Sequence, residues 1–244
     1  MKEAYYFGRT LAKEIEYFAY PRSGSHFLFY CLSGLFDMVA TLHSELHNQE
    51  AISRQAELNE IVLYALDLRE DGVLHQPVWI DALSNGIHGL PRPGGKPLIV
   101  LIREPVATLY SLFHTSTERW GATIPDVGAW LRTTADEYQR FYREAFRLIS
   151  ENRDRCLLLR YEALLSGPDE LRTIVDFVGV KPKLSPEFVY RITKFDSFVR
   201  PGQRTFYRAG DNERWRQDQR WLEALRAIEH YDFTDFGYRA LSAL

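Results

Sequence analysis

The chain has 244 residues, of which 45% are hydrophobic and 26% charged, the balance of an ordinary globular protein with one sizeable core. Its formal net charge of -3 gives no general attraction for duplex nucleic acid, so any anionic ligand must be met by local basic groups. Two cysteines, Cys31 and Cys156, are too few for a disulfide framework and lie in apolar runs, which predicts buried thiols.

The sequence also bears on localisation. Residues 1–18 contain no apolar stretch followed by a small-residue cleavage site, so we expect no secretory signal. No apolar run approaches the length of a membrane span. We therefore expect a cytoplasmic protein without a transmembrane segment.

Alternating strands and helices are predicted along the chain. Short apolar runs predict buried strands at 15–20, 98–102 and 156–159. Apolar residues at helical spacing predict helices at 27–42, 105–115, 127–149 and 169–178, with a terminal helix around 221–228. This order predicts an α/β fold, a single domain over residues 1–244 with a central parallel sheet flanked by helices. Proline, arginine and aromatic residues rise after residue 181, which predicts a covering loop at 181–212.

A polar loop, Tyr20-Pro-Arg-Ser-Gly-Ser-His-Phe27, joins the first predicted strand to an apolar helix. Gly24 permits a tight turn, and Ser23, Ser25 and the free N–H groups of the helix can converge on one anion. Arg22 adds a planar charged fork that suits phosphate or sulfate oxygens. The loop lacks the second glycine and the Lys-Ser/Thr of a Walker A motif, which disfavours an ordinary ATP or GTP site. A plain strand-to-helix turn with a serine cap is the alternative.

Two further segments place polar residues after predicted strands. Arg103 ends the second strand, Pro105 suits the first turn of the next helix, and Ser111 follows on that helix, so both polar side chains could face one phosphate. A surface salt bridge and a polar helix face are the alternative for this pair. Tyr161 and Glu162 follow the third strand, where the tyrosine could equally be a core residue with a satisfied hydroxyl.

Together these segments resemble the sulfotransferases that use 3'-phosphoadenosine 5'-phosphosulfate (PAPS). The loop is similar to the family's Tyr-Pro-Lys-Ser-Gly-Thr-Thr-Trp, the segment from Arg103 to Ser111 to Arg-Asn-Pro-x-Asp-Val-x-x-Ser, and Tyr161-Glu162-Ala-Leu to Tyr-Glu-Asp-Leu. Nearer the C-terminus, Arg208-Ala-Gly210-Asp-Asn-Glu-Arg-Trp215 resembles Arg-Lys-Gly-x-x-Gly-Asp-Trp. The resemblance implies a sulfotransferase architecture related to that of P-loop NTPases.

The resemblance also implies a role for each matching residue. Arg22 stands at the family's lysine and contacts the bridging and phosphate oxygens, while Ser23, Gly24 and Ser25 cradle the 5'-phosphate. His26 stands where a hydroxyl residue binds phosphate.

At the other end of the nucleotide, Phe27 replaces the tryptophan that packs on adenine, and Tyr161 contacts the same base. The residues implied for the 3'-phosphate, which distinguishes PAPS from other adenine nucleotides, are Arg103, Ser111, Arg208 and the backbone of Gly210.

Sulfuryl transfer by in-line displacement also requires a general base near the acceptor. Many family members place a histidine at the end of the strand that comes before the one ending at the arginine of the Arg-to-Ser segment. His88 occupies that place here, fifteen residues before Arg103, with His75 as the second candidate. Arg22 would assist the leaving group through its charge. Some carbohydrate sulfotransferases use a carboxylate, which keeps Glu45 and Asp81 open.

The expected reaction is transfer of a sulfuryl group from PAPS to a hydroxyl or amine acceptor, with release of 3'-phosphoadenosine 5'-phosphate (PAP). The acceptor is a small molecule, a lipid or a carbohydrate, and its identity and the oligomeric state stay open. His43 and His47 have the spacing of a metal pair, but no third ligand is evident, so we expect no metal. The alternatives are a small-molecule kinase on a related fold and a non-catalytic nucleotide-binding relative.

Overall fold

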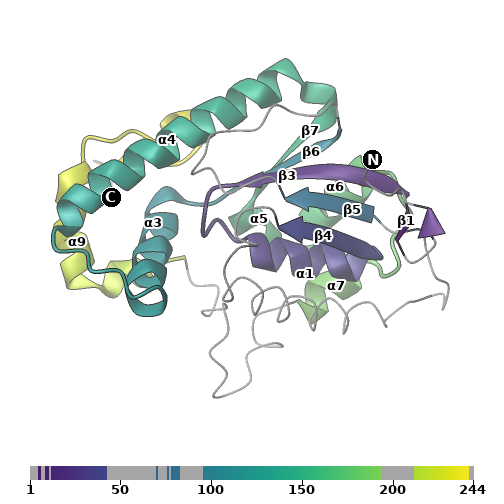
Figure 1. The fold of residues 1–244 in the computed structure, drawn as a ribbon, viewed down its shortest axis with the longest axis horizontal. Coiled ribbons are helices and arrows are strands. Elements are labelled where there is room, and N and C mark those ends of the chain that lie inside the picture. The colour runs from purple at the N-terminus through teal and green to yellow at the C-terminus, as the bar shows by residue number, and fades with distance from the viewer. Residues whose placement is uncertain are drawn as a thin grey trace.

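A five-stranded parallel sheet forms the centre of the computed structural model, which describes residues 5–6, 9–10, 12–42, 70, 76, 78–82, 96–193 and 212–241 (Figure 1). The strands are β3 (Lys13–Ala19), β4 (Met38–Leu42), β5 (Val78–Ala82), β6 (Leu98–Ile102) and β7 (Cys156–Arg160), in the spatial order β4-β5-β3-β6-β7. All four pairings are parallel. Two short strands, β1 (Tyr5–Tyr6) and β2 (Arg9–Thr10), form a separate antiparallel pair.

Helices connect and surround these strands. The α-helices are α1 (Ser25–Leu35), α3 (Pro105–His114), α4 (Val127–Glu151), α5 (Tyr161–Ser166), α6 (Asp169–Val178), α7 (Pro186–Ile192) and α9 (Gln219–Leu225). A π-helix, η1 (Thr115–Arg119), extends α3, and short 3-10 helices lie at η2 (Arg153–Arg155), η3 (Arg214–Gln217), η4 (Arg226–Ile228) and η5 (Thr234–Phe236). None of the helices in this part of the chain is long and apolar enough to cross a membrane.

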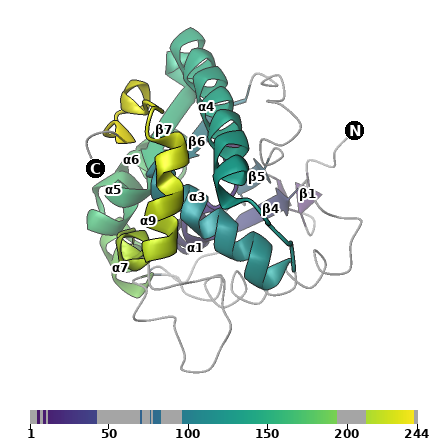
Figure 2. The same cartoon turned by 90° about the vertical axis from the view of Figure 1, so that its left-hand side faces the viewer.

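The alternating side chains of β3 divide the core into two apolar layers. Ile15, Tyr17 and Ala19 pack with residues of α1, α6 and α7, whereas Phe18 and Tyr20 pack on the opposite face with residues of α3, α4 and α9. Figure 1 shows α4 on one side of the sheet and α1 on the other, and Figure 2 shows the same ribbon turned by 90°. The α/β class and the central parallel sheet flanked by helices are therefore confirmed.

Strand order also fixes where a ligand can bind. The chain leaves β3 towards α1 and β4, on one side, and leaves β6 towards α3, α4 and β7, on the other. Neighbouring strands whose connections diverge in this way open a crevice at their carboxyl ends, where open α/β sheets bind ligands. The loops after β3 and β6 lie at this place in the fold.

Most predicted elements are confirmed within a few residues, but the helix predicted at 27–42 is wrong in its second half. The helix α1 ends at Leu35, Phe36 is extended, and residues 38–42 form β4, which pairs with β5 along its whole length. The β-branched Val39 and Thr41 favour a strand once a partner strand is present. The short strand β5 itself was not predicted.

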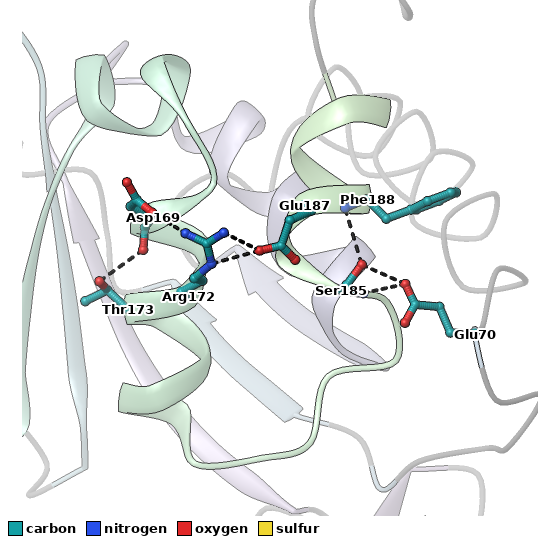
Figure 3. A network of polar contacts seen from close by, with 7 residues as sticks. All are labelled: Glu70, Asp169, Arg172, Thr173, Ser185, Glu187 and Phe188. Atoms are coloured by element: carbon teal, nitrogen blue, oxygen red, sulfur yellow. Dashed lines mark hydrogen bonds and ion pairs between the residues drawn. The ribbon is translucent and has the colours of Figure 1, made fainter.

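The covering loop predicted at 181–212 is wrong in part, since α7 lies inside it. Ser185 caps this helix through the backbone N–H of Phe188, and Pro186 occupies the first turn. Figure 3 shows Glu70 accepting hydrogen bonds from Ser185 beside the ion pair of Arg172 with Glu187. These contacts are solvent-exposed, so they stabilise the arrangement only slightly. Residues 194–211 lie outside the described part of the chain.

Candidate functional site

The segments that follow β3, β6 and β7 meet at the carboxyl edge of the sheet. The register places Ala19 opposite Leu101 and Leu101 opposite Leu159, so the three strands end level with one another. Nη1 of Arg103 donates to the carbonyl oxygen of Arg22 over 3.2 Å. Residues predicted separately as ligand contacts are thus neighbours.

Contacts among the side chains tie these loops more closely. Nε of Arg22 donates to Oγ of Ser111 on α3, 3.2 Å away. The guanidinium carbon of Arg103 lies 4.7 Å from the centre of the Tyr161 ring, within range of a cation–π interaction. Two permanent positive charges, a hydroxyl and an aromatic ring therefore share one edge of the sheet.

The loop after β3 has an unusual backbone. Arg22 has a φ of 68° and is the one non-glycine residue with positive φ among those that the structure describes, and Gly24 has a φ of 103°. Such conformations are costly for side-chain-bearing residues and gather at ligand sites. A Cβ at Gly24 would lie 2.3 Å from Cδ2 of Tyr161, so only glycine fits beneath this ring.

The start of α1 offers donors to an anion. Its N-terminus has no side-chain cap among the described contacts and no acidic residue in the first turn. The positive end of the helix dipole and the first N–H groups therefore favour a phosphate. Oγ of Ser25 accepts from the buried Tyr17 hydroxyl over 2.9 Å, which leaves the Ser25 proton for a further acceptor.

Ser23 faces the protein interior instead. Its side chain is fully buried, its hydroxyl bonds to that of Tyr142 over 2.9 Å, and its N–H donates to the carbonyl of Tyr20 over 3.2 Å. The Tyr142 hydroxyl also donates to the carbonyl of Leu101 over 2.8 Å, so it joins the loop to the end of β6. Ser23 thus fixes the shape of the loop, and the phosphate contact that the resemblance implies for it stays a prediction.

Two buried tyrosines one turn apart on α4 form hydrogen bonds with the segments that follow β3 and β6. Tyr138 donates to the carbonyl of Arg103 over 2.6 Å, while Tyr142 holds the loop after β3. Burial raises the pKa of both phenols, so they remain donors. The sequence carries a signal for this role in the two tyrosine hydroxyls on the helix predicted at 127–149, since buried phenols require hydrogen-bond partners.

The loop after β6 is shaped by carboxylates. Glu104 accepts from the N–H groups of Val106 and Ala107, at 3.1 and 2.6 Å, and so caps α3. Its burial raises the pKa of this carboxyl to about 7, which the two backbone hydrogen bonds only partly counteract. The N–H of Glu104 itself donates to Glu162 over 2.8 Å.

Two of the remaining predicted residues, His26 and Phe27, lie in the first turn of α1. Phe27 is buried, and its ring contacts the Tyr161 ring edge to face with centroids 5.9 Å apart, while His26 lies partly buried in the first turn of α1. Outside the described residues lie His88, His75, Arg208, Gly210, Glu45, His43 and His47. Asp81 belongs to β5, but its side chain is not described. No group of three or more potential metal ligands occurs among the described residues.

Fold and strand order together define an α/β protein with the sulfotransferase fold, the architecture that the sequence resemblance implied. Two solved structures are similar over most of the chain. Mouse sulfotransferase SULT7A1 complexed with PAP has a TM-score of 0.55 at 18% identity, and the match covers 90% of this chain and 85% of that one. Retinol dehydratase in complex with androsterone and the inactive cofactor PAP has a TM-score of 0.50 at 15% identity, covering 89% and 80%.

At these identities the likeness establishes the fold and not the reaction. No protein-family model matches the sequence, and the curated proteins contain no match to it. The reaction must therefore be argued from the site itself.

Proposed function

We propose that the protein transfers the sulfuryl group of PAPS to a hydroxyl or amine acceptor and releases PAP. The observation that carries the proposal is the direct link between Arg22 and Arg103, which follow different strands and meet at the edge of the sheet. The Arg103 guanidinium contacts the main chain of Arg22, so two permanently charged residues lie at one edge of the sheet, which suits a nucleotide with anionic groups at both its 3' and 5' positions. An ordinary adenine nucleotide lacks the first of these groups.

Each end of the nucleotide has its own set of donors in this proposal. Arg103 and Ser111 hold the 3'-phosphate, with Arg208 and Gly210 from the segment outside the described residues. The first turn of α1 and the Ser25 hydroxyl hold the 5'-phosphate. The adenine contacts Tyr161 and Phe27, whose rings already touch.

The chemical step is an in-line displacement at sulfur. A bond from sulfur to the acceptor oxygen or nitrogen forms as the bond to the bridging oxygen of the phosphosulfate breaks, and the acceptor proton passes to a base. Arg22 stabilises the charge that develops on the departing phosphate without giving up a proton, because a guanidinium stays protonated. We assign the base to His88, with His75 as the second candidate.

The acceptor is proposed to be a small molecule. The retinol dehydratase structure of the same fold contains androsterone together with PAP, which supports a small hydroxyl-bearing acceptor for this chain as well. Lipid and carbohydrate acceptors are tested in the same assay, because each carries a hydroxyl group that could displace PAP at the sulfur of PAPS.

The proposal is tested with sulfur-35-labelled PAPS and a panel of aromatic, lipid, carbohydrate and amine acceptors. We expect label in at least one acceptor, with PAP formed in equal amount. Arg22→Ala should slow transfer by roughly 10²–10³-fold, the effect of removing one group that stabilises developing charge. Arg147→Ala, which removes an exposed arginine of α4 paired with Glu144 and Glu151, is the matched control and should not change the rate.

Transfer of phosphorus-32 from the γ-phosphate of labelled ATP to an acceptor, with no sulfur-35 transferred from PAPS, would identify the small-molecule kinase. PAP binding without transfer to any acceptor would identify the non-catalytic relative.

A further inference from the structure

The side-chain amide of Asn212 bridges two groups of the site. Its Oδ1 accepts from Nε of Arg103 at 2.8 Å, and its Nδ2 donates to Oε1 of Glu162 at 3.2 Å. Asn212 is partly buried and lies two residues before η3, far from both partners in sequence. The resemblance gave this position no role, because the family pattern allows any residue there.

The chemistry of the partners fixes the direction of this amide. A guanidinium can only donate and a carboxylate can only accept, so the oxygen of Asn212 must face Arg103 and its nitrogen must face Glu162. A flipped amide would lose both hydrogen bonds. The contact therefore specifies an asparagine, a side chain that accepts at one end and donates at the other.

The far end of the bridge is anchored. The carboxylate of Glu162 also accepts from the backbone N–H of Glu104 over 2.8 Å and from the Tyr238 hydroxyl over 3.0 Å. These donors come from the loop after β6 and from the C-terminal segment, so Glu162 is held from two directions. Asn212 transmits that fixed position to Arg103.

We propose that Asn212 is a positioning residue that holds the Arg103 guanidinium over Tyr161 and aims it at the 3'-phosphate. This inference rests on the proposed function. Arg103 is then held by Asn212 through Nε, by the Arg22 carbonyl through Nη1 and by the Tyr161 ring beneath it. A guanidinium fixed on three sides loses less conformational freedom when it binds a phosphate.

Asn212 also separates opposite charges. It stands between the guanidinium of Arg103 and the carboxylate of Glu162, contacting both. Without the amide, the two charged groups can pair directly, and a guanidinium paired with a carboxylate has less of its charge and fewer N–H groups to offer a phosphate. The neutral bridge thus keeps Arg103 available to the ligand.

The test measures the affinities of PAP and of adenosine 5'-phosphate (5'-AMP), which lacks the 3'-phosphate, by calorimetry. We expect Asn212→Ala to weaken PAP binding about tenfold and to leave 5'-AMP binding within twofold, since one charge-assisted contact is affected. Adding Glu162→Gln to Asn212→Ala should recover most of the lost PAP affinity, because the competing carboxylate is gone. Asn212→Ser is measured alongside and should behave as Asn212→Ala does.

The matched control is Asn152→Ala. Asn152 also accepts from an arginine, Arg155, and donates through its amide, but at the end of α4. It should leave both affinities unchanged.

The outcomes separate this inference from the proposed function. A wild-type protein that binds PAP no more tightly than 5'-AMP contradicts the proposed function. If the wild type binds PAP more tightly than 5'-AMP and Asn212→Ala keeps the same preference, the positioning role of Asn212 is contradicted and the proposed function is not. Equal weakening of both nucleotides in that variant, or further weakening when Glu162→Gln is added, would show that Asn212 only supports the fold.

Discussion

Replacing Gly24 by alanine tests the close approach of the first loop to the Tyr161 ring. The new methyl carbon would lie 2.3 Å from Cδ2 and 2.6 Å from Cε2 of that ring, where ordinary contacts begin near 3.4 Å. Gly24 also has a φ of 103°, which alanine adopts only with strain. The substitution therefore adds a steric cost to a conformational one.

Both costs can be estimated. A left-handed conformation costs a residue with a Cβ about 1–2 kcal/mol. Inserting a methyl group into a packed site costs typically about 1–3 kcal/mol more. The ring can escape only by moving relative to Phe27 and Arg103, which it contacts, so the proposed nucleotide site would change shape.

Gly179→Ala isolates the conformational cost. Gly179 has a φ of 68°, and a Cβ there would meet nothing within 4 Å. We expect this variant to lose about 1–2 kcal/mol in urea unfolding and to bind PAP as the wild type does. Gly24→Ala should lose at least about 1 kcal/mol more and bind PAP at least tenfold more weakly.

The comparison also has a rescue. The Tyr161→Ala substitution removes the overlapping ring. Gly24→Ala should therefore cost less stability when it is made in the Tyr161→Ala variant than when it is made in the wild type. Equal stability losses in Gly24→Ala and Gly179→Ala, or unchanged PAP affinity in Gly24→Ala, would refute the close packing of loop and ring.

Three other variants test separate features. Tyr142→Phe should destabilise the protein by about 1–3 kcal/mol in urea unfolding, because it leaves buried hydrogen-bond partners unsatisfied. The loss should be smaller in a Ser23→Ala background, and additive losses from the two substitutions would exclude the hydrogen bond between Tyr142 and Ser23. Glu104→Gln tests the carboxyl whose pKa is raised to about 7 from 4.5. Between these values the folded protein binds a proton that the unfolded chain has released, so this group favours folding most at low pH. The wild type should therefore lose up to about 1.4 kcal/mol more per pH unit than Glu104→Gln as pH rises from about 5 to 7, and parallel stability curves would contradict this. His88→Ala should slow transfer roughly 10²–10⁴-fold without changing PAP affinity. An unchanged rate would contradict the assignment of the base to His88, and His75→Ala would then test the second candidate.

The parts of the fold that were predictable from sequence are those with local causes. The apolar run at 98–102 becomes a strand in which every residue is buried between two helical layers. The run at 156–159 forms the neighbouring edge strand, in which Leu159 is buried and the other residues are partly buried. Gly24 marks the tight turn because the backbone there needs a φ that other residues avoid. The strand β4 was missed because its conformation depends on β5, a partner about 40 residues away in the sequence.

The supporting contacts of the site could not be predicted for the same reason. Tyr142 and Ser23 are 119 residues apart, and Asn212 and Arg103 are 109 apart. Such pairs become neighbours only when the strand order brings the ends of β3 and β6 together. Local sequence therefore indicated the residues proposed to contact the ligand, whereas the partners of Ser23 and Arg103 could not be read from it.

The central claim is that one site on this chain binds an adenosine with phosphates at both the 3' and the 5' position. Calorimetric titration of PAP and 5'-AMP into the wild type and into Arg103→Ala tests it most directly. We expect the wild type to bind PAP at least tenfold more tightly than 5'-AMP, and Arg103→Ala to bind the two nucleotides alike. Equal affinities in the wild type, or a preference for PAP that survives the loss of Arg103, would contradict the claim.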